Sequence, residues 1–258
     1  MLALLGAMRE EVTGLKERMS LEEALAPPGC RMYAGKYRER DVLLVQTGIG
    51  RKMAERAVEL ALKRFPITGI VSFGFSGALT GELKVGDVVL CPTLQCVDGH
   101  AQPPVEPTGP CHSDTELVSL AVKALESNRI GFVHGTSITT SKLVWDAEAK
   151  YDLGRTFSAE VVDMESYWIA RIASGKGIPF LSIRTVSDAA ADTLPPLGRL
   201  VQSDGRLRWK AAALYFLPRP RQLLKLIGFF RKAQRASQRL TTSIECLVAE
   251  LGNRPRNP

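Results

Sequence analysis

Short apolar runs alternate with longer amphipathic segments along most of this chain. Leu2–Leu5, Asp41–Gln46, Gly69–Phe73 and Ile178–Val186 are each short and apolar enough to form a buried strand. Segments with helical periodicity, such as Lys52–Lys63, lie between these runs. Strands that alternate with helices predict an α/β fold in which helices cover a mostly parallel sheet.

Weaker signals extend this pattern through the middle of the chain. Gly74–Leu79 (GFSGAL) predicts a glycine-rich turn, and the Pro- and Gly-rich segment Asp98–His112 predicts irregular structure. The spacing Ser113-x-x-Glu116 predicts a capping box at the start of a helix. We further expect strands at Val88–Cys91, Gly131–His134 and Val161–Val162, and helices at Glu10–Met19, Ser113–Leu125, Asp146–Leu153 and Met164–Ser174.

Composition and cysteine usage narrow the class of protein. The 258 residues are 45% hydrophobic and 24% charged, which is usual for a soluble globular protein. The chain has no uncharged apolar stretch long enough to span a membrane, and its short apolar N-terminus predicts a first strand rather than a signal peptide. The five cysteines form no CxxC pair, and the three histidines have no ligand spacing. We therefore expect a cytosolic protein with reduced thiols and no metal site.

Basic residues are concentrated in the last quarter of the chain. Residues 199–258 hold 13 of the 34 Lys and Arg residues but 3 of the 27 Asp and Glu residues, so the remaining residues are slightly acidic. Within this tail, LLKLIGFF at residues 223–230 lies between arginines. It is either a packed final helix with solvated arginines or an interfacial helix that meets anionic lipid. We expect no nucleic-acid partner, because no binding motif or stacking platform accompanies the charge.

The residues that follow the predicted strands are the candidates for function. In parallel α/β sheets, ligands bind at the carboxyl ends of the strands. Glycine residues and the acidic residues Asp and Glu are common at these positions. The segments concerned are Gly6–Glu11, Thr47–Gly50, Gly74–Gly77, Thr136–Ser141, Asp163–Glu165 and Ser187–Asp188.

Each of these segments alone also has an ordinary structural explanation. The TGIGRK turn at residues 47–52 could bind an anion through backbone N–H groups, or it could be a plain tight turn. Asp163, Glu165 and the Ser187–Asp188 pair could be helix caps. A single motif therefore does not establish a site, and their combination has to be considered.

Five of the segments, in chain order, resemble the purine nucleoside phosphorylase/uridine phosphorylase superfamily. They are GAMREEV (6–12), QTGIGRKMA (46–54), FGFSGALTGELKVGDVV (73–89), VVDMESYWIA (161–170) and PFLSIRTVSDAAAD (179–192). The resemblance favours the nucleosidase-like branch, which includes methylthioadenosine/S-adenosylhomocysteine nucleosidases. It implies a three-layer αβα sandwich around a twisted, mixed central β-sheet. Residues 1–198 would form the catalytic domain and residues 199–258 a basic helical extension.

The resemblance also implies an enzyme that cleaves an N-ribosidic bond, and it assigns roles to residues. Asp188 matches the general acid that protonates N7 of the departing purine, and Ser187 would orient it. Met164 and Glu165 match the ribose site, where a carboxylate accepts hydrogen bonds from vicinal hydroxyls. Glu11 matches the acid that orients the attacking water in the hydrolytic branch. The base-binding loop falls near Ser141, Lys142 and Leu143.

The sequence leaves open whether water or phosphate accepts the ribosyl group. The phosphorolytic branch usually carries an arginine two residues before the GFSGA motif, where this chain has Ser72. That departure weakens a prediction of phosphorolysis, although Arg9 and Arg51 could still hold a phosphate. We expect no cofactor, with inorganic phosphate as the one candidate co-substrate. The candidate anion or water site comprises Gly6, Arg9, Gly48, Gly50, Phe75 and Ser76.

The basic tail and the GFSGAL variant also resemble hopanoid-associated phosphorylases. This resemblance implies release of adenine from a lipid-linked nucleoside, adenosylhopane, by a cytoplasmic protein that is peripheral on the inner membrane face. The alternatives are a soluble methylthioadenosine or S-adenosylhomocysteine substrate, and a non-catalytic nucleoside-binding module. The presence of Glu11, Glu165 and Asp188 argues against the last. The family further implies a homo-oligomer, in which the Asp98–His112 loop could complete a neighbour's pocket.

Overall fold

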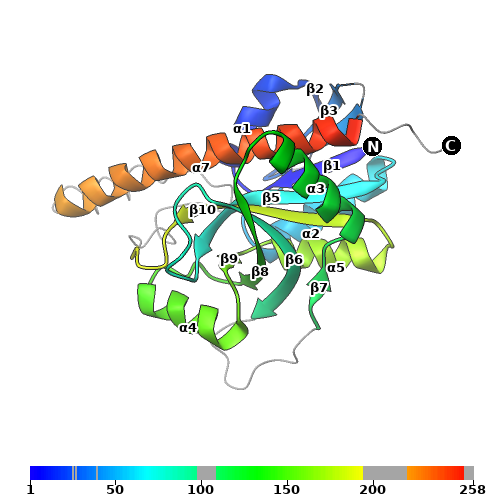
Figure 1. Ribbon diagram of the computed structural model, residues 1–258. Coiled ribbons are helices and arrows are strands. Elements are labelled where there is room, and N and C mark those ends of the chain that lie inside the picture. Colours follow the sequence, from blue (N-terminus) through cyan, green and yellow to red (C-terminus); the bar gives the residue numbers. More distant parts are fainter. Residues whose placement is uncertain (25, 27, 39, 98–108, 194–219, 253–258) are drawn as a thin grey trace.

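Ten strands form one mixed sheet in the computed structural model, which describes residues 1–24, 26, 28–38, 40–97, 109–193 and 220–252 (Figure 1). The strands are β1 (Leu2–Gly6), β2 (Ser20–Ala24), β3 (Arg31–Tyr37), β4 (Arg40–Gln46), β5 (Gly69–Ala78), β6 (Val88–Val97), β7 (Cys111–His112), β8 (Phe132–Thr140), β9 (Val161–Asp163) and β10 (Phe180–Asp188). The helices are α1 (Arg9–Arg18), α2 (Arg51–Arg64), α3 (Thr115–Ser127), α4 (Ala147–Phe157), α5 (Ser166–Gly175) and α7 (Pro220–Gly252).

The centre of the sheet is parallel, in the order β4, β1, β5, β10. β10 also pairs with β6, and β6, β8 and β9 lead back to β5, so these five strands close into a ring. β2 and β3 extend the open side as antiparallel strands beyond β4. The carboxyl ends of β1, β5 and β10 therefore lie at the same edge of the sheet, where a ligand is expected.

Helices cover both faces of the sheet, which confirms the predicted three-layer arrangement (Figure 1). Successive residues of a strand point to opposite faces. Leu2 and Leu4 accordingly pack with α1, α3 and α7, whereas Ala3 and Leu5 pack with α2 and α5. This burial on both faces explains why the central strands are continuous apolar runs in the sequence.

The second half of α7 is part of the core. Ala236, Leu240, Ile244, Leu247, Val248 and Leu251 are buried at helical spacing and face α1, α3 and β10. Glu245 and Glu250 pair with Arg18 at 2.6 Å and Lys123 at 2.7 Å on the surface. This stretch is therefore a packed final helix. The domain boundary after residue 198 stays a prediction, and residues 199–219 lie outside the described residues.

The first half of α7 continues past the end of the sheet, as its orange ribbon in Figure 1 shows. Within the described part of the chain, no helix is long and apolar enough to span a bilayer. The predicted neighbour-contacting loop, Asp98–His112, lies mostly outside the described residues, which resume at Gly109.

The predicted turn at Gly74–Leu79 is wrong, because β5 runs through to Ala78. Because these glycines have no side chain, side chains of neighbouring elements can lie close to the backbone of β5. A Cβ at Gly74 would lie 2.6 Å from Oε1 of Glu11 and 2.7 Å from Nη1 of Arg184. A Cβ at Gly77 would lie 3.1 Å from Oδ2 of Asp188.

Two further local predictions are corrected. The N-cap of α3 is Asp114, whose carboxylate accepts from the Leu117 N–H at 2.9 Å, and not Ser113. Ser113 instead donates its hydroxyl to the Cys91 carbonyl at 2.7 Å. β2 and β3 were not predicted, since SLEEA and RMYAGKY lack a clean alternation of apolar and polar residues.

Candidate active site

The three carboxyl groups singled out in the sequence are all buried at the carboxyl edge of the sheet. Glu11, Glu165 and Asp188 are 3%, 8% and 4% exposed. Glu11 reaches β5 at Gly74 and Phe75, and Asp188 reaches the same strand at Gly77. Carboxyl groups are seldom buried without hydrogen-bond partners or charges that hold them there, so the partners of each one matter.

Glu11 is held by backbone N–H groups from two elements. Its Oε2 accepts from Ala7 at 2.6 Å and Met8 at 2.9 Å, and its Oε1 accepts from Phe75 at 2.7 Å. The contact with Met8 is that of a capping box, in which the third helical residue turns back to the N-cap. Burial raises the pKa of Glu11, although these N–H groups and Arg184 favour the ionised form. The side chain is thus fixed beside β5 by three backbone N–H groups.

Glu165 connects the glycine turn after β4 to the start of α5. Its Oε1 accepts from the Gly50 N–H at 2.6 Å, and its side chain makes no cap bond to its own helix. Burial, together with the neighbouring Asp163 and Glu11 carboxylates, raises the pKa of Glu165 to about 8. Met164 precedes it in the turn between β9 and α5.

Asp163 is the carboxylate of this motif that accepts from backbone N–H groups at the start of α5. Its Oδ1 accepts from the N–H groups of Glu165 at 3.0 Å and Ser166 at 3.1 Å, and Thr139 donates its hydroxyl at 2.8 Å. Burial would raise the pKa of Asp163, but Arg184 and the hydroxyl donors outweigh it and lower that pKa. Of the two carboxylates in VVDMES, Asp163 therefore binds the N–H groups at the start of α5, whereas the Glu165 side chain makes no bond to that helix.

Arg184 is a buried cation among these carboxylates. It is 2% exposed, its Nε lies 2.9 Å from Asp163 Oδ2, and its Nη2 donates to Ser72 Oγ at 2.6 Å. Arg184 was not among the residues predicted from the sequence to form the site. A charged residue inside an otherwise apolar strand was the signal available, because such a charge needs a buried partner.

Asp188, the last residue of β10, receives two side-chain hydrogen bonds. Ser187 donates its hydroxyl to Oδ1 at 2.7 Å, and Lys150 of α4 donates to Oδ2. Burial raises the pKa of Asp188, while Lys150 and Ser187 oppose that rise. Lys150 was not predicted from the sequence, because its contact with Asp188 depends on how α4 docks against the ring of strands.

The backbone donors proposed for an anion are engaged within the protein. The Gly48 N–H donates to Ala7 O at 3.0 Å, the Gly50 N–H to Glu165, and the Phe75 N–H to Glu11. Arg9 is exposed on the first turn of α1, and Gly6 ends β1. Ser76 Oγ is buried with no hydrogen-bond partner among the described residues.

The predicted base-binding residues lie on the connection between β8 and α4. Ser141, Lys142 and Leu143 are exposed there, and the Lys142 carbonyl accepts from the Thr140 hydroxyl at 2.9 Å. Trp145, two residues further on, is 51% exposed. This stretch therefore presents apolar side chains next to the strand ends.

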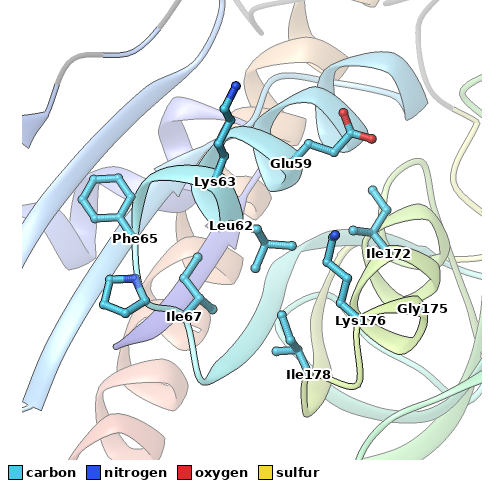
Figure 2. Close-up of a pocket in the computed structure, with 10 residues that line it drawn as sticks. Glu59, Leu62, Lys63, Phe65, Ile67, Ile172, Gly175, Lys176 and Ile178 are labelled. Carbon is cyan, nitrogen blue, oxygen red and sulfur yellow. The ribbon is translucent and has the colours of Figure 1, made fainter.

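The hollow shown in Figure 2 lies elsewhere on the molecule. It has a volume of about 790 Å³ and is lined by the last turns of α2 and α5, with Phe65, Ile67 and Ile178. Those residues precede the amino ends of β5 and β10, opposite the edge at which α/β sheets bind ligands. None of the predicted site residues lines it.

Comparison with known proteins identifies the family. The model of the phosphorylase superfamily matches residues 1–210. This chain belongs to the phosphorylase superfamily. Within it, the chain is 30% identical over 207 residues to the 5'-methylthioadenosine/S-adenosylhomocysteine nucleosidase of Tolumonas auensis, covering 75% of this chain and 88% of the relative. Membership confirms the resemblance inferred from the five motifs, and with it the prediction of a nucleoside phosphorylase or N-ribosyl hydrolase.

Solved structures of the superfamily share the fold. Futalosine hydrolase of Helicobacter pylori matches with a TM-score of 0.76 and 20% identity, covering 96% of this chain and 97% of its own. The nucleosidase of Neisseria meningitidis, in complex with methylthio-immucillin-A, matches with a TM-score of 0.76 and 23% identity over 96% and 98% of the two chains. Such low identities support the architecture alone, and the predicted αβα fold agrees with it.

Replacing Glu165 with glutamine should change how the stability of the protein depends on pH. With a pKa of about 8 in the folded protein and an ordinary value of 4.5, Glu165 favours folding below pH 4.5 and loses that contribution as pH rises through 8. The free energy of unfolding of the wild type, relative to Glu165→Gln, should therefore fall by a few kcal/mol between pH 5 and pH 9. Urea denaturation at both pH values measures this.

The matched control for that experiment is Glu126→Gln on α3, whose side chain is exposed. It should change stability equally at both pH values. If the free energies of unfolding of Glu165→Gln and Glu126→Gln differed from the wild type by amounts that change equally with pH, the raised pKa of Glu165 would be contradicted.

Proposed function

We propose that this protein cleaves the N-ribosidic bond of an adenine nucleoside, with water as the acceptor. The observation that carries the proposal is the placement of two buried carboxyl groups, Glu11 and Asp188, beside Gly74 and Gly77 of the same strand. Both groups lie at the carboxyl edge of the sheet, where α/β folds bind ligands. One acid there can protonate the leaving base while a second carboxyl group takes the proton of the attacking water.

Each carboxyl group has a distinct task in this reaction. Protonated Asp188 gives its proton to N7 of the purine while the C1′–N9 bond breaks and its electron pair passes to the departing base. Glu165 accepts hydrogen bonds from the ribose hydroxyls. Water attacks C1′ and passes a proton to Glu11, and exchange with solvent then restores the proton on Asp188 and removes that on Glu11.

Two features of the site favour water over phosphate. The N–H groups of Gly48, Gly50 and Phe75 already donate to protein oxygens, so they are committed before any anion arrives. Arg51 pairs with Glu55 at 3.0 Å and its guanidinium lies 3.9 Å from the Trp168 ring centroid. These engagements support hydrolysis.

Adenine release is therefore expected without phosphate. Adenosylhopane, methylthioadenosine and S-adenosylhomocysteine would each be incubated with the protein in phosphate-free buffer, and free adenine and reducing sugar would be measured. From whichever nucleoside is cleaved, we expect both products in equal amounts, and no increase in rate when phosphate is added. Release that requires phosphate, with a ribosyl 1-phosphate as product, would contradict water as the acceptor.

For the finer identity of the substrate, we propose a lipid-linked nucleoside, adenosylhopane. Exposed apolar side chains support this, since Leu143 and Trp145 are 39% and 51% exposed beside the candidate base loop and Tyr151 is 37% exposed on α4. Such a group could receive the apolar substituent of the nucleoside. Methylthioadenosine or S-adenosylhomocysteine remains the alternative substrate, and rapid turnover of either one would argue against the lipid.

A peripheral membrane location goes with the lipid substrate. Residues 221–232 of α7 hold an apolar run that Lys225 interrupts and that Arg221, Arg231 and Lys232 flank, a composition typical of helices at anionic lipid surfaces. We expect the full chain to sediment with vesicles containing phosphatidylglycerol and not with phosphatidylcholine alone. Serine at Lys225, Arg231 and Lys232 should abolish this binding, whereas serine at Lys52, Lys63 and Arg64 of α2 should not.

Substitution is preferable to truncation here, because the second half of α7 is buried in the core. Equal sedimentation of both triple variants would reject an interfacial role of residues 221–232. We also propose a homo-oligomer, which sedimentation equilibrium of the full chain tests; a monomer at micromolar concentration would reject it.

A further inference from the structure

Lys150 is a completely buried cation whose three N–H donors all meet oxygen. Its side chain has 0% exposure and its Nζ pairs with Asp188 Oδ2. The same Nζ donates to the carbonyl oxygens of Ala189 at 3.2 Å and Asp192 at 2.9 Å. An ammonium group carries three donors, so Lys150 is fully satisfied at the end of β10. Burying a charge is costly, and this one is held where the proposed general acid lies.

The docking of α4 determines the position of the Lys150 ammonium group. Asp146 caps the helix by accepting from the Ala149 N–H at 3.1 Å, which places Lys150 in the first turn. Further along, Gly154 lies so close to the sheet that a Cβ there would be 2.7 Å from the Leu79 carbonyl. Because α4 packs this tightly against the residue following β5, the ammonium group has little freedom to move relative to Asp188.

We propose that Lys150 is a positioning residue for the proton transfer, one that orients the Asp188 carboxyl group and stabilises the carboxylate left when the proton passes to the purine. This inference rests on the proposed function. Before transfer, the ammonium faces a neutral acid; after transfer it faces a full negative charge. Its interaction therefore strengthens along the reaction, which is the condition for accelerating the chemical step.

The groups that face Asp188 support a dominant effect of Lys150. Burial raises the pKa of Asp188, and Lys150 is the strongest influence in the opposite direction. Ser187 also lowers it through its hydroxyl, and the Asp192 carboxylate raises it. From β5, the residue that faces the carboxyl group is Gly77, which carries no charge. Removing Lys150 should therefore raise the pKa of Asp188.

The test is the pH profile of adenine release by Lys150→Met. We expect kcat to fall by about 10- to 100-fold with a smaller change in KM, since the orientation and charge stabilisation of the acid are lost. We also expect the alkaline limb of the kcat profile to move to higher pH, because Asp188 would keep its proton longer. Lys150→Arg, which retains the charge, should keep the wild-type limb.

Three comparisons make the outcome decisive. Arg155→Met, on the exposed side of the same helix, should match the wild type in rate and in pH profile. In the Asp188→Asn background, Lys150→Met should cost little further rate, because both changes act on one proton transfer. If Lys150→Met does not fold, Lys150→Gln, which keeps a hydrogen-bond donor without the charge, takes its place in the same profile.

The results separate this inference from the proposed function. A wild type that releases no adenine from any nucleoside would overturn the proposed function. An active wild type with an unmoved alkaline limb in the Lys150→Met or Lys150→Gln variant would overturn the role of Lys150, as would additive losses in the double variant.

Discussion

Asp188→Asn should lower kcat by about 10²–10⁴-fold while leaving nucleoside binding largely intact. Asparagine keeps the shape of the side chain and can accept from Lys150 and Ser187, but it cannot give a proton to N7. The leaving purine would then depart with its negative charge uncompensated. Because the lost interaction exists only in the transition state, the effect should appear in kcat and not in KM.

Single-turnover release of adenine measures the chemical step directly, and calorimetric titration of the variant with the nucleoside that the wild type cleaves measures nucleoside binding. Asp152→Asn on α4, whose side chain is 57% exposed, is the matched control and should be indistinguishable from the wild type. Cleavage by Asp188→Asn at the wild-type rate would remove Asp188 from the mechanism. Retained binding with lost turnover would also argue against the non-catalytic alternative.

Arg184→Met should destabilise the protein by about 3–5 kcal/mol, the usual result when one partner of a buried ion pair is removed. Methionine fills much of the same volume, but Asp163 would lose its cation while remaining buried and ionised. Glu11 and Glu165 would also lose a nearby positive charge. Urea denaturation at pH 7 measures the loss in the free energy of unfolding.

The size of that loss should depend on pH. Arg184 lowers the pKa of Asp163 below its ordinary value of 3.8, so the pair stabilises the fold above that pH and its contribution is lost as pH falls through the lowered pKa. The difference between wild type and Arg184→Met should therefore shrink in strong acid. Arg155→Met, which breaks an exposed pair with Asp152, should cost at most about 1 kcal/mol at pH 7. Equal losses for the two arginine variants at pH 7 would rule out a special role of Arg184.

Much of the fold could be predicted, because its central strands are buried on both faces. Leu2–Leu5 and Gly69–Phe73 are apolar runs with no other explanation, and the structure places both in the middle of the sheet. The edge strand β2 and its neighbour β3 gave no such signal, since β2 has no buried residue and carries exposed charges such as Glu22 and Glu23. The closing of five strands into a ring depends on β10 pairing with both β5 and β6, which no local pattern encodes.

The amino-acid sequence by itself indicated the family, because glycines and carboxyl groups follow the strands in a specific order. The same order indicated the edge of the sheet at which Glu11, Glu165 and Asp188 lie. Three-dimensional packing was needed to assign their partners. Arg184 of β10 pairs with Asp163 of β9 and lowers the pKa of Glu11 on α1, and Lys150 of α4 donates to Asp188, which follows it by 38 positions. Electrostatic interactions act over distances in space, and local sequence patterns contain no information about which distant charges will meet.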